Sequence, residues 1–255
     1  MTVSGERVTT SEGGFNPTWQ RHVAAYALCA RFLGRGRVLD LGCGVGHSFE
    51  LLAPRETVGV DLDAGALAGQ ARETVVADMR ELPFPDASVA SVLSIQSIEH
   101  VPDPERVLAE ARRVLEPGGV AVFLTPNRLT FARADEIIDP YHHVEYDPAR
   151  LRALCEPFFA AVKLQGLFGS TRYAELWAEQ TARLDRLLAA DPLRVRRAVP
   201  RALRQRLYDA LLTRARRSAD PRAAAIGVED FELRSEDLEA ALDLVAVCRD
   251  GGAGP

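Results

Sequence analysis

The most informative stretch of the chain is a short apolar run, residues 38–41, followed directly by Gly42, Gly44 and Gly46. The run is long enough for one buried strand and too short for a helix. Residues 48–52 then return to helical spacing. Glycines at such a turn let the backbone approach a ligand closely, and the first N–H groups of a following helix point outward. This arrangement predicts a loop that binds a nucleotide-like ligand.

The spacing of the glycines indicates which ligand. A dinucleotide-binding fingerprint, Gly-x-Gly-x-x-Gly, would need a glycine where this chain has His47. The glycines alternate instead as Gly-x-Gly-x-Gly, behind an acidic residue, Asp40, inside the strand. The spacing therefore disfavours a pyrophosphate and with it a nicotinamide oxidoreductase.

Two further strand patterns, 57–61 and 74–77, lead to the carboxylates Asp61 and Asp78. Asp61 follows Gly42 by close to the roughly 20 residues expected of an acid that accepts hydrogen bonds from ribose hydroxyls. Its two oxygens match two vicinal hydroxyls. Leu62 is then placed to lie against an adenine face, while Asp78 can accept from the adenine amino group and the Met79 backbone N–H can donate to the ring. The alternative is that Asp61 is an exposed turn residue without a ligand. The nearby glycine loop favours the ribose-binding role.

The motif Asp-x-Gly-x-Gly-x-Gly resembles motif I of the class I S-adenosylmethionine-dependent methyltransferases. Residues 77–95 are similar to the segment that these enzymes write as ADxxxLPFPDxSFD. The stretch EHVPDPERVLAEARRVLEPGG, followed by TPN, resembles their small-molecule O-methyltransferase branch, which includes quinone-biosynthesis enzymes. The resemblance covers residues 37–127 without a gap. It implies that S-adenosylmethionine is bound by Asp40, Gly42 and Gly44 at its amino-acid end, and S-adenosylhomocysteine is the product.

A narrower resemblance extends along the chain. Gly5-Glu6-Arg7, Gln96-x-x-Glu99-His100, Thr125-Pro126-Asn127-Arg128, His142-x-x-Glu145 and Gly166-Leu167-Phe168 occur in the same order in actinobacterial sugar O-methyltransferases. This chain departs from them after Gly169. The resemblance implies transfer to a hydroxyl of a small molecule, such as a sugar or glycoside, but the identity of the acceptor does not carry over. Gln96 follows the fourth strand, at the edge where open α/β sheets bind ligands, and is predicted to contact the cofactor.

A hydroxyl acceptor must lose its proton near neutral pH, and histidine is the natural base. The chain has five histidines. His22 and His47 are interpreted as structural or solvent-facing. His142 is the preferred base, because Glu145 three residues on can orient its second ring nitrogen. His100 is expected near the reacting methyl group, as a third catalytic residue. The alternative is that His142 is a loop residue and Glu145 a surface acid, with no catalytic role.

Glu99 and His100, together with His142, could also hold a divalent metal ion. Quinone-type relatives carry Glu where this chain has Gln96, and the loss of a charged ligand weakens a site for a hard cation. No metal site is therefore predicted, and a divalent ion is the less favoured alternative.

These residues need a sheet to position them. Strand patterns at 38–41, 57–61, 74–77, 89–95, 120–125, 160–168 and 243–248 alternate with helical patterns that include 17–33, 105–115 and 148–158. Such alternation predicts an α/β fold with a parallel sheet. The resemblance specifies a Rossmann-like, seven-stranded, mostly parallel sheet with helices on both faces. It also implies that the last strand is antiparallel and lies between the fifth and sixth.

The predicted organisation has five parts: an N-terminal arm and covering helix (1–34), an S-adenosylmethionine-binding core (35–170), a helical lid insertion (171–222), the final strand of the core (223–250) and a tail (251–255). The insertion carries leucines at helical spacing and an arginine-rich stretch, 194–206. We expect it to cover the acceptor site.

Composition and net charge indicate which kinds of substrate and partner the protein has. The 255-residue chain is 47% hydrophobic and 26% charged, with a net charge of −5, which argues against a nucleic-acid substrate. Its four cysteines show no paired spacing, as expected of reduced thiols. Residues 1–17 lack the apolar core of a signal peptide, and no apolar run reaches membrane-spanning length. We expect a cytoplasmic protein without a membrane partner that acts on a small molecule; a homodimer is left open.

Two functional alternatives remain beside O-methyl transfer. One is N-methylation of a small molecule, and the other is a protein that binds S-adenosylmethionine without turnover. Residues 96–99 do not match the Asn-Pro-Pro-Tyr-type motif, which disfavours methylation of a macromolecular nitrogen.

Overall fold

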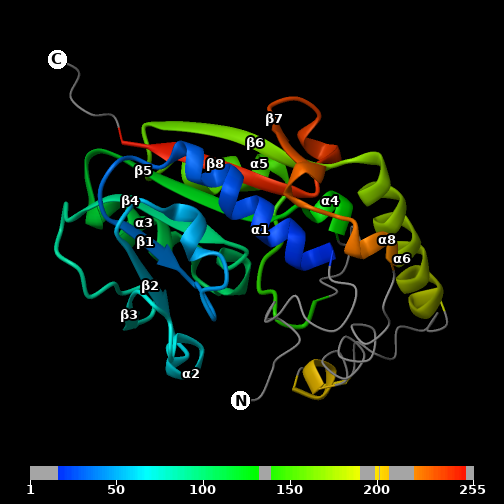
Figure 1. Cartoon of the computed structure of the whole chain (residues 1–255). Coiled ribbons are helices and arrows are strands. Elements are labelled where there is room, and N and C mark those ends of the chain that lie inside the picture. The colour runs from blue at the N-terminus through cyan, green and yellow to red at the C-terminus, as the bar shows by residue number, and fades with distance from the viewer. Residues whose placement is uncertain (1–16, 132–138, 190–198, 201, 207–220, 251–255) are drawn as a thin grey trace.

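In the computed structural model, eight strands of the described residues form one sheet, and helices cover both faces (Figure 1). The structure describes residues 17–131, 139–189, 199–200, 202–206 and 221–250. The sheet order is β3-β2-β1-β4-β5-β8-β6-β7. The strands are β1 (Val38–Leu41), β2 (Thr57–Asp61), β3 (Glu73–Val76), β4 (Val89–Ile95), β5 (Leu115–Pro126), β6 (Ala161–Gly169), β7 (Phe231–Arg234) and β8 (Asp243–Arg249).

The helical segments lie between and around these strands. The α-helices are α1 (Pro17–Cys29), α2 (Ala64–Leu67), α3 (Pro104–Val114), α4 (Arg128–Phe131), α5 (Pro148–Cys155), α6 (Thr171–Ala189) and α8 (Pro221–Ala224). Short 3-10 helices are η1 (Ala30–Phe32), η2 (Phe49–Leu52), η3 (Ile98–His100), η5 (Val228–Asp230) and η6 (Leu238–Ala240).

The Rossmann-like α/β prediction is confirmed. Strands β3, β2, β1, β4 and β5 pair in parallel, and β8 lies antiparallel between β5 and β6, as expected for the last strand. The number of strands differs, because β7 adds an eighth strand at the edge, antiparallel to β6. This four-residue strand pairs with residues more than 60 positions earlier in the chain, and sequence periodicity does not report such a pairing.

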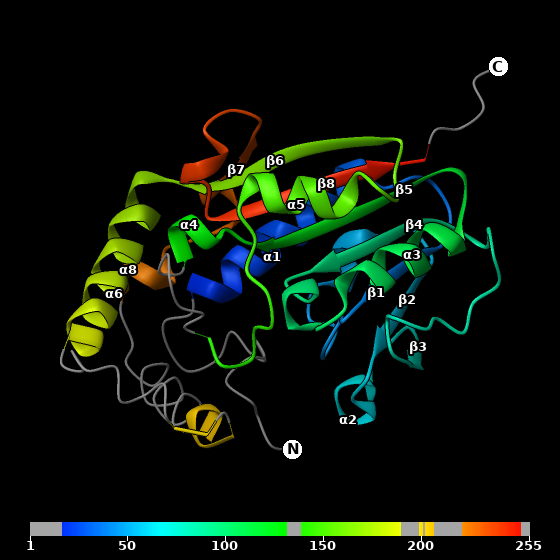
Figure 2. The ribbon, with the colours of Figure 1, turned by 180° about the vertical axis from the view of Figure 1, so that it is seen from behind.

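Apolar side chains divide between the two faces of the sheet. On one face, α1 packs Ala25 and Cys29 against strand residues such as Val38 and Leu93. The opposite face is covered by α3 and α5 (Figure 2). The central strands β1 and β4 are buried along their whole length, which explains their nearly continuous apolar sequence.

Several predicted boundaries differ from the structure by a few residues, and two of the differences have a clear physical reason. Helix α3 ends at Val114 rather than at Leu115, because Leu115 already pairs with Val89 as the first residue of β5. Pro117 and Gly118 therefore lie within β5, at its irregular start, and do not terminate the helix. After the glycine loop, residues 49–52 form a single 3-10 turn, since Pro54 follows and has no N–H to continue a helix.

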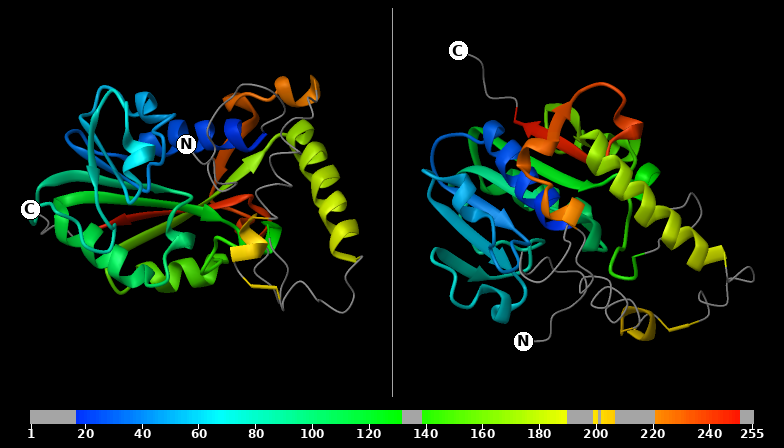
Figure 3. Two further views of the ribbon diagram at one scale, coloured as in Figure 1. Left: turned by 90° about the horizontal axis from the view of Figure 1, so that it is seen from below. Right: turned by 45° about the vertical axis from the view of Figure 1, so that its right-hand side comes forward.

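Helix α6 is the longest described part of the predicted insertion, of which residues 199–200, 202–206 and 221–222 are also described. It lies at the end of the molecule opposite to β3 (Figure 3). Tyr173 and Leu176 pack with Leu167 of β6, with α1 and with Phe231 of β7. The remaining expectations for the arm (1–16), for residues 190–198 and 207–220, and for the tail (251–255) fall outside the described residues.

No helix in the described ranges combines the length and the apolar character needed to cross a membrane.

Candidate active site

The parallel register brings the ends of three strands together. Leu41, the last residue of β1, lies opposite Val60 of β2 and Ser94 of β4. The residues that follow, Gly42, Asp61 and Gln96, therefore share one edge of the sheet. This is the edge at which the sequence predicted a cofactor site.

The glycine loop is closely packed on one side and open on the other. Gly42, Gly44 and Gly46 have φ values of +68°, +53° and +68°, which residues with a side chain rarely adopt. A Cβ at Gly42 would lie 2.5 Å from the Cβ of Ser97, whereas a Cβ at Gly44 would meet no atom within 4 Å. The loop therefore leaves room for a ligand in front of Gly44.

Asp61 adjoins this open side. Its Oδ2 accepts a hydrogen bond from the Gly44 backbone N–H at 2.9 Å, and its Oδ1 accepts from the Asp63 N–H at 2.9 Å. Leu62, the next residue, is 68% exposed. An acid and an uncovered apolar side chain beside an open loop fit the sugar and the base of a nucleoside, and these contacts stay predictions.

Asp78 and Met79 follow β3 at the same edge. The Asp78 carboxylate accepts from the Arg80 guanidinium, with 2.7 Å between Oδ2 and Nη2, and this hydrogen bond lowers the pKa of Asp78. Met79 packs against the core next to Gly42. An adenine contact by Asp78 would therefore use an oxygen that Arg80 also binds.

Asp40 lies beneath the loop with both oxygens engaged by protein groups. Oδ1 accepts from the Tyr26 hydroxyl of α1 at 2.9 Å, and Oδ2 accepts from Arg72 Nη2 at 2.8 Å. Burial raises the pKa of Asp40, and the charge of Arg72 opposes that rise. These contacts fix the loop from below, and a direct cofactor contact of Asp40 stays a prediction.

Two residues of the loop before β3 complete this support. Gln70 Nε2 donates to the Gly44 carbonyl oxygen at 2.8 Å, and Arg72 Nε donates to Gln70 Oε1 at 3.0 Å. Sequence reasoning missed Tyr26, Gln70 and Arg72. No spacing signal marks them, because each reaches the loop from a separate segment.

Gln96 has a left-handed backbone, with φ of +48°, directly after β4. Its N–H donates to the Leu124 carbonyl at 2.7 Å, and its side-chain Nε2 donates to Asp243 Oδ1 at 3.2 Å. Asp243 is also paired with Arg21 of α1, whose Nε donates to Oδ2 at 2.6 Å. Gln96 is thus fixed where β4, β8 and the covering helix meet.

The three residues predicted as catalytic lie together. His142 and Glu145 are 8% and 4% exposed, and Nδ1 of the imidazole lies 3.3 Å from Oε1 of the carboxylate. Assigning the Nδ1 proton to this contact leaves Nε2 as the basic nitrogen, 4.0 Å from Asp139 Oδ2. The rings of His142 and His100 lie edge to face, 5.0 Å apart.

Opposing effects set the pKa of His142. Burial lowers it, but the hydrogen bond with Glu145 and the charges of Glu99 and Asp139 outweigh burial, so the pKa is raised above its usual value of 6.5. Glu99 is 1% exposed, and burial raises the pKa of its carboxyl group. Its Oε2 accepts from the Thr125 hydroxyl at 2.9 Å.

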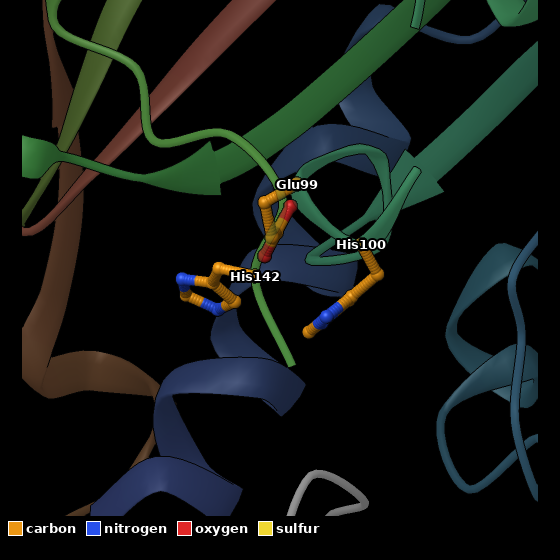
Figure 4. A group of neighbouring side chains, drawn as sticks. All are labelled: Glu99, His100 and His142. Atoms are coloured by element: carbon orange, nitrogen blue, oxygen red, sulfur yellow. The ribbon is translucent and has the colours of Figure 1, made fainter. Parts of the chain in front are cut away.

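One oxygen of Glu99 and one ring nitrogen from each of His100 and His142 lie within 4.8 Å of one another (Figure 4). Carboxylate and imidazole are donors that divalent transition metals accept. The geometry is thus compatible with the less favoured alternative of the sequence analysis, in which these residues hold a cation.

The fold and this edge define a class of protein. A Rossmann-like sheet with an alternating glycine loop after β1, an acid at the end of β2 and an antiparallel last strand is the architecture of class I methyltransferases that use S-adenosylmethionine. A family model described as "Methyltransferase domain" matches residues 39–123.

Two relatives that align over nearly the whole chain agree. A protein of Mycolicibacterium smegmatis, named "Probable S-adenosylmethionine-dependent methyltransferase", is 32% identical over 97% of this chain and 94% of its own length. One of Mycobacterium tuberculosis with the same description is 32% identical over 97% of this chain and 89% of the relative. The chain belongs to the S-adenosylmethionine-dependent methyltransferase family.

Solved structures share the fold. A methyltransferase of Archaeoglobus fulgidus aligns with a TM-score of 0.53 at 18% identity, over 92% of both chains. One of Thermotoga maritima aligns with a TM-score of 0.59 at 16% identity, over 91% of both chains. The family implies S-adenosylmethionine as cofactor, which confirms the predicted class of enzyme and its cofactor.

Proposed function

We propose that the protein transfers a methyl group from S-adenosylmethionine to a hydroxyl of a small molecule, such as a sugar or glycoside. The observation that carries this proposal is the buried His142–Glu145 pair, 3.3 Å apart, beside the predicted cofactor edge. A hydroxyl, unlike a neutral amine, must lose its proton to act as a nucleophile at neutral pH. A buried imidazole oriented by a carboxylate is suited to remove it.

The bound cofactor supplies a methyl group that its sulfonium already activates. The work left to the protein is alignment of the acceptor, exclusion of water and removal of one proton. In our proposal the acceptor hydroxyl lies against Nε2 of His142, which takes the proton. Nδ1–H remains hydrogen-bonded to Glu145, and the carboxylate stabilises the imidazolium that forms.

The environment of His142 supports this role. Water has little access to the pair, because the His142 and Glu145 side chains are buried, and the Phe131 and His100 rings lie 5.4 Å and 5.0 Å from the imidazole, centroid to centroid. Asp139 and Glu99 add negative charge near the ring, which favours the protonated imidazole after transfer. His100 is assigned to the wall of the acceptor site.

The test is transfer of a tritiated methyl group from labelled S-adenosylmethionine into metabolite extracts, followed by isolation of the labelled product. His142→Ala should lower the rate at least 100-fold, the typical contribution of a general base. His143→Ala is the matched control, because His143 is exposed and adjacent in sequence. Full activity of His142→Ala would overturn the assignment of the base.

The same experiment separates the alternatives. A labelled amine in the product would establish N-methylation. Cofactor binding by calorimetry, with no labelled product from a broad panel of hydroxyl and amine acceptors, would favour a binding protein without turnover.

A further inference from the structure

Three buried polar atoms around the glycine loop have no hydrogen-bond partner in the described part of the chain. They are Nδ1 of His22 on α1, Nε2 of His47 and the hydroxyl of Ser48. A buried donor or acceptor without a partner costs about 1–3 kcal/mol, and nearly all such groups in folded proteins are paired. Three unpaired atoms on neighbouring residues therefore indicate a ligand that completes them.

The side chains that carry these atoms are close together. The rings of His22 and His47 lie 5.2 Å apart, and Trp19 of α1 lies 4.4 Å from His47 on centroid distances. Tyr26, whose hydroxyl supports Asp40, meets the His47 ring edge-on at 6.1 Å. The covering helix thus places the His22 imidazole against that of His47. His47 follows Gly44 by three residues, and a Cβ at Gly44 would meet no atom within 4 Å.

The donor set indicates the kind of group that would bind. Burial lowers the pKa of His22 to about 3 and that of His47 to about 4, so both imidazoles are neutral at pH 7. Each neutral ring has one N–H, and Ser48 has one O–H. The His22 side chain is also hydrogen-bonded to Gln96, and the tautomer in which Gln96 donates to the ring leaves the N–H of His22 on Nδ1. Ser48 precedes η2 without capping it, so its hydroxyl is not needed by the backbone. Three neutral donors match a carboxylate, which accepts several hydrogen bonds.

We propose that His22, His47 and Ser48 bind the α-carboxylate at the amino-acid end of the cofactor. The inference rests on the cofactor of the proposed function and extends it, because the sequence analysis interprets both histidines as structural or solvent-facing. The covering helix, which carries His22, is held in place by the contacts of Tyr26 with Asp40 and of Arg21 with Asp243.

The test compares S-adenosylmethionine with decarboxylated S-adenosylmethionine, which lacks only the carboxylate, by calorimetry. The variants are His22→Phe and His47→Phe, which keep a ring in the aromatic packing, and Ser48→Ala. Each should weaken the Kd for S-adenosylmethionine about tenfold or more, the effect of losing one hydrogen bond to a charged group. The Kd for the decarboxylated compound should change less than twofold. His143→Asn, at an exposed histidine, is the control.

Equal weakening for both compounds would overturn the proposal, because the residues would then act by supporting the loop. Unchanged affinity for S-adenosylmethionine in all three variants would overturn it as well. If His47→Phe does not fold, as judged by circular dichroism, Ser48→Ala decides the outcome with the smallest change in packing. Failure of the unaltered protein to bind either compound would be a failure of the proposed function itself, distinguishable without any variant.

Discussion

The hydroxyl of Tyr26 on α1 donates a 2.9 Å hydrogen bond to Oδ1 of Asp40 on β1, directly beneath the glycine loop. The other oxygen of Asp40 is bound by Arg72, which reaches it from the segment before β3. A carboxylate inside a central strand is tolerated because these two groups satisfy it. The contact ties the covering helix to the strand from which the loop begins.

Removal of one hydrogen-bond partner of Asp40 should therefore destabilise the folded protein. Arg72→Met leaves a buried carboxylate without its ion pair, and we expect a loss of about 3–5 kcal/mol in the free energy of unfolding. Urea titration followed by circular dichroism measures it. Arg37→Met is the control, since Arg37 forms its ion pairs with exposed acids and should cost less than about 1 kcal/mol. Similar losses in both variants would contradict the role given to Arg72.

The second prediction concerns the pH dependence of methyl transfer. His142 must be neutral to accept a proton, and its pKa is raised above 6.5. The rate constant kcat/KM should therefore rise with pH along a limb whose midpoint lies above 6.5. Glu145→Gln removes the partner that stabilises the imidazolium, so the midpoint should move to lower pH while the maximal rate falls. A midpoint that Glu145→Gln leaves in place would argue against the pair.

The same raised pKa has a consequence for stability. Because His142 binds its proton more tightly in the folded state, its stabilising contribution is complete below pH 6.5 and disappears as pH rises through the folded pKa. His142→Asn should therefore destabilise the protein more at pH 5.5 than at pH 9, in thermal unfolding monitored at both values. A difference of the opposite sign would show that the imidazole is not protonated preferentially in the folded protein.

Asp61 is predicted to hold the cofactor's ribose. Asp61→Ala removes the acceptor for the Gly44 N–H and both oxygens for the sugar hydroxyls, so affinity for S-adenosylhomocysteine should fall at least about tenfold. Calorimetry measures the Kd. Asp63→Ala is matched in charge and two residues away, where its carboxylate accepts from the Gly65 N–H, and should leave the Kd within about threefold. Unaltered binding by Asp61→Ala would remove the basis of the predicted cofactor site.

The next prediction concerns the ion pair that holds the covering helix α1 against β8. Arg21 and Asp243 form a buried ion pair, with side chains 4% and 0% exposed. Asp243→Leu alone should cost about 3–5 kcal/mol, because Arg21 is left buried and unpaired. The double variant Arg21→Met, Asp243→Leu should recover most of that loss in urea unfolding. If the double variant is as unstable as the sum of the single ones, the two side chains do not act as a pair.

The last prediction concerns metal dependence. With His142 as the base, methyl transfer should proceed at an unchanged rate after treatment with EDTA. Loss of activity on chelation, restored by a divalent cation and abolished by Glu99→Gln, would assign the cluster of Glu99, His100 and His142 to a metal instead.

Much of the fold could be predicted because its signals are local. The apolar runs of β1, β2 and β4 are each continuous in sequence and the glycines directly follow β1, so these local patterns indicated a parallel sheet with a ligand at its edge. Similarly, the three-residue spacing of His142 and Glu145 was sufficient to propose their contact, and the structure brings them within 3.3 Å. Their catalytic role, like the cofactor contacts, stays a prediction.

Contacts between distant segments were not predictable. Arg21 and Asp243 are 222 positions apart, and Arg72 lies 32 positions from Asp40. Each of these arginines resembles any surface arginine in a chain that has many. The edge strand β7 was missed for a similar reason, since its four residues form a strand only against β6.

The sequence by itself determined the class of fold, the position of the glycine loop and the acids that follow the strands, because periodicity and glycine conformation act over a few residues. Only the tertiary structure decided which of these acids are satisfied by the protein and which buried polar atoms are left without a partner in the described residues. That difference separates Asp40, closed by Tyr26 and Arg72, from His47 and Ser48, and it depends on how α1 packs over the loop. Burial and pairing are properties of the packed whole, so no single stretch of sequence encodes them.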